Sequence, residues 1–223
     1  MRWALRSIGK TIFFNFHYLP FCQAIRLPII LYKPRLTKLK GKIIIEGGVR
    51  TGMVWLGPNR VSIYPNTGIN YENNGGTIVF RGHCIIGNNS SLSLGQGSKL
   101  IFGSNFHATS SFRLACYNYI EFGNKVLFGW ECIVVDTDFH KLEFMNREHN
   151  KGYGPIIIGN GNWICLRCSI LKNTILPDSC VVSANSLLSK KYTESHCLIS
   201  GMPAEIKRRG ICRNPDDDKV EYK

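Results

Sequence analysis

The residues best suited to catalysis are a histidine and two aspartates at alternate positions, Asp136, Asp138 and His140. Imidazole titrates near neutral pH, so His140 could take the proton of a hydroxyl group and make its oxygen a nucleophile. In an extended segment the three side chains point to the same side of the chain. Asp138 is the nearest carboxylate that could accept the second ring N–H and orient His140. Asp136 or Glu143 could instead hold the ring or a substrate hydroxyl.

The other histidines and the cysteines are less promising as reactive groups. We interpret His83 and His107 as corner or surface residues. The chain contains nine cysteines, an odd number for a disulfide framework, so reduced thiols are expected. Cys165 and Cys168 have the spacing of half a zinc site, but no second pair follows at ligand spacing. We therefore expect no metal.

A six-residue period organises most of the chain and must position these groups. The large apolar members of the repeat are Phe80, Ile86, Leu92, Phe122, Phe128, Val134, Ile158, Ile164, Ile170, Leu176, Val182 and Leu188. Small residues recur four positions after such residues, at Cys84, Ser90, Ser98, Cys132, Cys168, Thr174, Cys180 and Ser186. Six is a multiple of two and not of 3.6, so the period predicts short strands joined by corners.

Two features interrupt or mark this repeat. Glycine directly follows several of the large apolar residues, as a sharp corner would require. The period stops after His140 and resumes near Ile156, so residues 141–155 are predicted to leave the coil as a loop. Long excursions from a regular scaffold commonly carry functional sites.

The pattern resembles that of the left-handed parallel β-helix acyltransferases. Residues 122–140 resemble the active-site segment of bacterial polysaccharide and sugar O-acetyltransferases. Residues 158–209 are similar to the closing coils and Gly-x-Pro-Ala tail of that family, although Cys165 replaces a usual glycine. The resemblance implies an all-β, left-handed parallel β-helix with a short helical N-terminal segment, and the handedness comes from the family alone.

The resemblance also implies how the substrates bind. Acetyl-CoA would be the acyl donor, and the donor and a sugar acceptor would meet in a cleft between the subunits of a homotrimer. The positions that match the family pattern for coenzyme A are Trp163, Ala184, Ser189, Lys190 and Arg208. Trp130, Asp136 and Glu143 are the candidates for acceptor binding. The basic residues after the repeat suit phosphate groups, or else form a solvated tail.

The net charge of +13 predicts an acidic partner, and much of it lies in residues 1–50, where Glu46 stands against ten Lys and Arg residues. Arg2, Arg6 and Lys10 recur at helical spacing opposite apolar residues. Residues 1–20 could thus form a helix on an anionic membrane or a cap on the coil. Nucleic acid is not expected, because no recognised binding module is present.

We therefore expect three regions: a basic amphipathic segment 1–41, a β-helix 42–209 and a polar tail 210–223. No apolar stretch of about 18 residues and no secretory signal is evident, which favours a cytoplasmic protein, with peripheral contact to the inner face of the cell membrane left open. The expected activity is O-acetylation of a cell-surface polysaccharide or its sugar precursor. N-acylation of an amino sugar and a non-catalytic β-helix scaffold are the alternatives.

Overall fold

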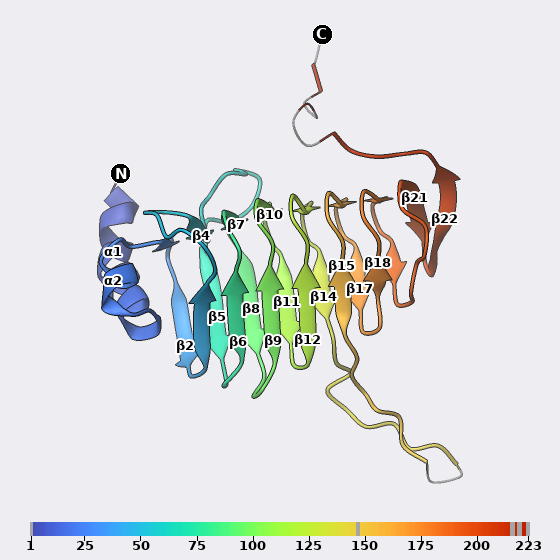
Figure 1. The fold of residues 1–223 in the computed structure, drawn as a ribbon, viewed down its shortest axis with the longest axis horizontal. Coiled ribbons are helices and arrows are strands. Elements are labelled where there is room, and N and C mark those ends of the chain that lie inside the picture. Colours follow the sequence, from blue (N-terminus) through green and yellow to red (C-terminus); the bar gives the residue numbers. More distant parts are fainter. Residues whose placement is uncertain (1, 146–147, 215–216, 218–219, 222–223) are drawn as a thin grey trace.

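The structure is a computed structural model that describes residues 2–145, 148–214, 217 and 220–221, with side chains from residue 7 onward. Short strands stack in parallel on three sheets to form a left-handed β-helix, which confirms the predicted fold (Figure 1). Two helices, α1 (Arg2–Tyr18) and α2 (Phe21–Ala24), stand at the N-terminal end of the stack.

The sheets run the length of the coil. The first sheet contains β1 (Ile29–Leu31), β4 (Val54–Leu56), β7 (Cys84–Ile86), β10 (Phe106–Ala108), β13 (Leu127–Phe128), β16 (Trp163–Ile164), β19 (Val181–Val182), β21 (Cys197–Gly201) and β22 (Ala204–Arg209). The second contains β2 (Arg35–Leu39), β5 (Ile69–Asn73), β8 (Ser90–Leu94), β11 (Arg113–Cys116), β14 (Ile133–Val135), β17 (Ser169–Leu171) and β20 (Leu187–Leu188). The third contains β3 (Lys42–Ile45), β6 (Thr77–Phe80), β9 (Lys99–Phe102), β12 (Tyr119–Phe122), β15 (Ile156–Ile158) and β18 (Ile175–Leu176).

The hexapeptide rows form the interior of the coil. Phe80, Phe102 and Phe122 lie in register on β6, β9 and β12 and are fully buried, with ring centroids 5.4 and 5.6 Å apart. Burying each such ring contributes about 1.5–3 kcal/mol. The eight predicted small residues are likewise buried, because little space remains inside a narrow coil. All nine cysteines are free thiols, as expected.

The corners reveal why glycine follows some apolar residues and not others. A Cβ atom on Gly87 would lie 1.5 Å from the Thr109 carbonyl oxygen of the next coil, so the close approach of two backbones requires glycine there. Most of these corners turn two residues further on, at a non-glycine residue with positive φ such as Asn89 or Asn105. Glycine is thus a response to local crowding, and Cys165 stands at a corner without it.

The coil begins earlier than residue 42, which corrects the predicted boundary. β1 pairs with β4 and β2 pairs with β5, so residues 29–39 already belong to the first coil. Pro28 and Pro34 directly precede β1 and β2. Directly before a strand a missing N–H costs no ladder hydrogen bond, so both prolines are compatible with the coil.

At the opposite end, β21 and β22 form an antiparallel pair that terminates the parallel stack. Residues 210–214 then run back along the coil (Figure 1). Within the described part of the chain, no helix has the length and apolar character needed to cross a membrane.

Candidate functional site

The predicted loop is present and projects from the coil between β14 and β15 (Figure 1). Its two arms lie antiparallel, with bridges between Thr137 and Tyr153 and between Glu143 and His149. The N–H of Asp138 donates to the carbonyl of Gly152 at 2.7 Å, which ties the arms together near the coil. The loop is therefore a hairpin-like extension.

Asp136 lies at the base of this loop and is fully buried. Its carboxylate accepts hydrogen bonds from the backbone N–H of Tyr117 at 2.7 Å and of Asn118 at 2.8 Å, at the corner of the preceding coil. Burial raises the pKa of the Asp136 carboxyl, and the two N–H donors partly counteract that rise. Within one chain both oxygens are engaged inside the protein, which favours a structural role, and contact of Asp136 with a substrate stays a prediction.

Asp138 and His140 are accessible but are not brought together. The Asp138 carboxylate forms an ion pair with Lys172, whose Nζ lies 2.7 and 2.5 Å from the two oxygens. The His140 side chain is exposed, and no described residue forms a hydrogen bond with its ring. The prediction that Asp138 orients His140 is therefore not realised within one chain.

Lys172 is the site residue that the sequence did not indicate. Leu171 pairs with Val135 in the register of β14 and β17, which places the next residue, Lys172, beside the start of the loop. Lys172 and Asp138 are 34 residues apart in the sequence, and the pairing of β14 with β17 brings them together. Counting the hexapeptides on both sides of the loop would have provided the signal.

Glu143 lies on the loop, as expected, whereas Trp130 lies at a different corner of the coil. Glu143 is exposed on the loop, where it bridges to His149. Trp130 lies at the corner between β13 and β14, where its ring contacts that of Tyr64 with centroids 6.2 Å apart. The loop with His140 leaves from the next corner, so one chain does not bring Trp130 to His140.

The candidate coenzyme A residues are exposed in the last coils but face in different directions. Trp163 points outward from β16 with 38% of its surface exposed. Ala184 lies at the corner after β19, whereas Ser189 and Lys190 follow β20. Lys190 forms an ion pair with Glu205 at 2.5 Å. Arg208 is exposed on β22, in the chain's final hairpin. Trp163 and Arg208 lie in one row of the first sheet, through Val181 and Leu198, whereas Ser189 and Lys190 lie at the corner after β20 in the second sheet.

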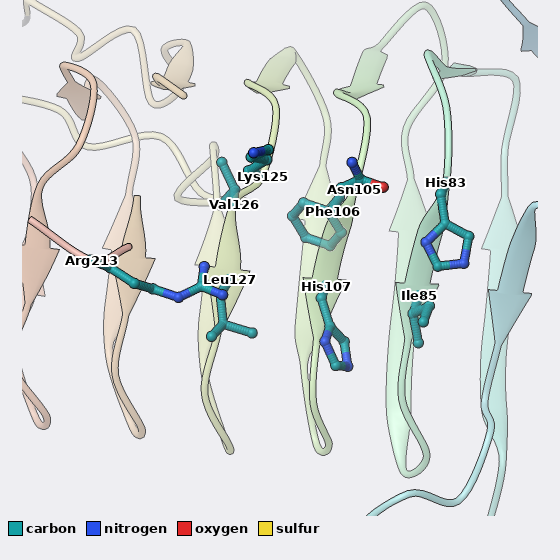
Figure 2. A pocket seen from close by; sticks show the side chains of 9 residues that line it. All are labelled: His83, Ile85, Asn105, Phe106, His107, Lys125, Val126, Leu127 and Arg213. Carbon is teal, nitrogen blue, oxygen red and sulfur yellow. The ribbon is translucent and has the colours of Figure 1, made fainter. Parts of the chain in front are cut away.

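A separate cavity of about 240 Å³ lies on the outer face of the first sheet. Figure 2 shows His83, His107 and Arg213 among its labelled side chains, with Arg213 reaching in from the C-terminal tail. Burial, with the charges of Arg60, Arg213 and His83, lowers the pKa of His107 to about 4. His107 is half-buried and neutral near pH 7, which differs from the surface role expected for it. The described lining contains basic residues and no acidic one, so its charge suits an anion.

The pair Cys165 and Cys168 is ill-suited to metal or redox chemistry. Burial raises the pKa of Cys165 to about 11, and Cys168 is fully buried. Across the residues that the structure describes, no cluster of three His, Cys, Asp or Glu side chains could hold a metal ion.

No family model matches the chain. An uncharacterized 24.8 kDa protein in the cps region of Klebsiella pneumoniae is 28% identical over 182 residues, which are 82% of this chain and 80% of that protein. The polySia specific acetyltransferase NeuO has a TM-score of 0.56 and 18% identity, over 85% of this chain and 75% of that one. An acetyl-CoA complex of a hexapeptide-repeat acetyltransferase from Vibrio cholerae O1 biovar eltor has a TM-score of 0.38 and 17% identity, over 92% of this chain and 85% of that one. The chain shares the fold of NeuO.

Proposed function

We propose that this protein is an O-acetyltransferase that moves an acetyl group from acetyl-CoA to a hydroxyl of a cell-surface polysaccharide or its sugar precursor. The observation that carries the proposal is an exposed imidazole, His140, on a loop that projects from a fold shared with a polySia specific acetyltransferase. The relative from Klebsiella pneumoniae, described by its position in the cps region, is consistent with work on a surface glycan. Fold alone does not define an activity, so His140 is the critical point of the proposal.

In the proposed reaction His140 acts as the general base. Acetyl-CoA supplies the activated thioester. His140 takes the proton of the acceptor hydroxyl as its oxygen bonds to the acetyl carbon, and returns a proton to the sulfur as the C–S bond breaks. The Asp138–Lys172 ion pair fixes the base of the loop on which His140 stands. In this proposal the chain contributes both the general base and the ion pair that positions its loop.

A complete site requires more than one copy of the chain. Within one subunit Trp130 and His140 lie on different corners, and the coenzyme A candidates Trp163, Ala184 and Lys190 face different directions. In a homotrimer, the loop of one subunit could meet the outer face of its neighbour and exclude water from His140. This arrangement would also place the basic cavity near His107 within reach of an anionic part of a substrate.

The test compares two histidines on the same loop. We expect His140→Ala to abolish release of free thiol from acetyl-CoA in the presence of glycan from the producing cells. His149→Ala, an equally exposed change on the same loop, should retain activity. Normal activity in His140→Ala would refute the proposed base.

The product distinguishes the alternative activities. Mass spectrometry of surface glycans from cells with and without the protein should show the mass of one acetyl group, removed by mild alkali as an ester. An alkali-stable amide would indicate N-acylation. A non-catalytic β-helix scaffold that lacks the donor site should give no heat on titration with acetyl-CoA.

A further inference from the structure

Helix α1 packs against the coil through the buried ring of Phe14 and a row of three buried polar side chains. Ser7, Thr11 and Asn15 are at most 4% exposed and lie one helical turn apart. Their side-chain oxygens accept hydrogen bonds from the backbone N–H groups of Lys33 at 2.9 Å, Leu31 at 3.1 Å and Ile29 at 3.1 Å. Asn15 also donates to the Ile29 carbonyl at 2.7 Å. The helix therefore satisfies the open edge of β1, the first strand of the stack.

This arrangement leaves a second group of apolar side chains on the helices facing away from the coil. We define the outer helical face as Ile12, Phe13, Phe16, Phe21 and Ile25, which are 43%, 52%, 45%, 71% and 60% exposed. Phe16 and Phe21 contact each other edge to face at 5.9 Å, so α1 and α2 form one continuous surface. Grouped exposed side chains of this size mark an interaction surface.

The N-terminal part of the chain, which carries the outer helical face, is strongly basic. Residues 7–50 include eight Lys and Arg residues and a single acidic residue, Glu46. Lys10 lies on α1 and Arg26 directly follows the C-cap residue of α2, and they donate to the carbonyls of Pro34 and Val49, both at 3.0 Å. These bonds hold the two cations on the edge of the cap. An apolar face bordered by cations matches the boundary of a bilayer with anionic headgroups.

We propose that the outer helical face docks this protein onto an anionic lipid bilayer, with the aromatic side chains in the interface and the cations among the headgroups. A second copy of the chain is a poorer occupant, because pairing two such faces would bring like charges together. The proposal depends on the packing of α1 and not on acetyl transfer, so either can fail without the other.

Vesicle binding by the full chain tests this surface. We expect co-sedimentation with phosphatidylglycerol–phosphatidylcholine vesicles at 0.1 M NaCl, and weaker binding at 0.5 M NaCl or to phosphatidylcholine alone. The double variant Phe13→Ser, Phe16→Ser should bind about tenfold or more weakly, since each ring loses its burial in lipid. The matched control Phe144→Ser removes a phenylalanine that is 54% exposed on the loop and should bind as the parent does.

A second measurement leaves the aromatic side chains of the outer helical face in place. Cys22 is exposed in α2, and Cys212 is exposed in the tail. An environment-sensitive fluorophore on Cys22, in a Cys212→Ser background, should shift to the blue when the anionic vesicles are added. The same label on Cys212, in a Cys22→Ser background, should not shift. Equal binding to neutral and anionic vesicles, or no shift at Cys22, would overturn the proposal. It would also be overturned if the parent did not bind vesicles and the double variant had a lower oligomeric mass than the parent, because the outer helical face would then join copies of the chain.

Discussion

Replacing the buried Asp136 by asparagine should destabilise the protein without acting on a substrate directly. The aspartate accepts one backbone N–H on each oxygen, at 2.7 and 2.8 Å, and is fully buried. An asparagine of the same size can accept only one of these bonds, and its NH₂ group would face the other donor. A buried donor left without an acceptor costs about 1–3 kcal/mol.

Two effects set the net magnitude for Asp136→Asn. Burial raises the pKa of the Asp136 carboxyl, so removing its charge recovers part of a desolvation cost. The lost charge-assisted bond acts in the other direction. We expect the free energy of unfolding to fall by about 1–3 kcal/mol, or roughly 2–10 °C in Tm for a chain of this size.

Denaturant unfolding at pH 7 measures this change. The control is Asp138→Asn, which alters a one-third-exposed ion pair and should cost less than about 1 kcal/mol. If Asp136 instead held the acceptor sugar, Asp136→Asn would raise the acceptor KM and leave the unfolding midpoint unchanged. A free energy of unfolding within about 0.5 kcal/mol of the parent would refute the structural role.

Two further predictions concern the cavity and the base of the loop. Burial and neighbouring cations lower the pKa of His107 to about 4, so its NMR titration should have a midpoint near 4. Because the unfolded chain binds this proton more tightly, stability should decrease as pH falls from about 6.5 to about 4, and a midpoint above 6 would contradict the cavity environment. Lys172→Met should release the Asp138 carboxylate and lower kcat about three- to tenfold, with stability changed by less than about 1 kcal/mol. An unchanged kcat would show that the ion pair does not position the loop.

The sequence predicts the coil well because its interior is restrictive. A narrow coil accepts large apolar groups such as Phe122 and small ones such as Cys132 only at fixed spacing, so the period is visible without a structure. The loop is predictable for the same reason, since residues 141–155 interrupt the period. The resemblance to the acyltransferases then supports the choice of His140 as the base.

The surroundings of His140 were not predictable by the same reasoning. Alternation along a strand places Asp136, Asp138 and His140 on one side, but it takes no account of the neighbouring coils. Stacking places Asp136 under the backbone of residues 117–118 and Lys172 beside Asp138. Likewise, the polar row of α1 is buried because the edge of β1 needs partners, a demand that the helix sequence alone does not reveal.

The stacking of whole coils also fixes the distance between the helical cap and the loop. From β2 at the capped end, four successive parallel pairings through β5, β8 and β11 lead to β14, where the loop departs. At about 4.8 Å for each step, the base of the loop stands about 19 Å along the axis from the first coil. Adding or removing one complete coil would change this standoff by one strand spacing and leave the helical cap and the terminal hairpin intact. The distance between the helical cap and the base of the loop that carries His140 is therefore set in discrete steps by the number of coils.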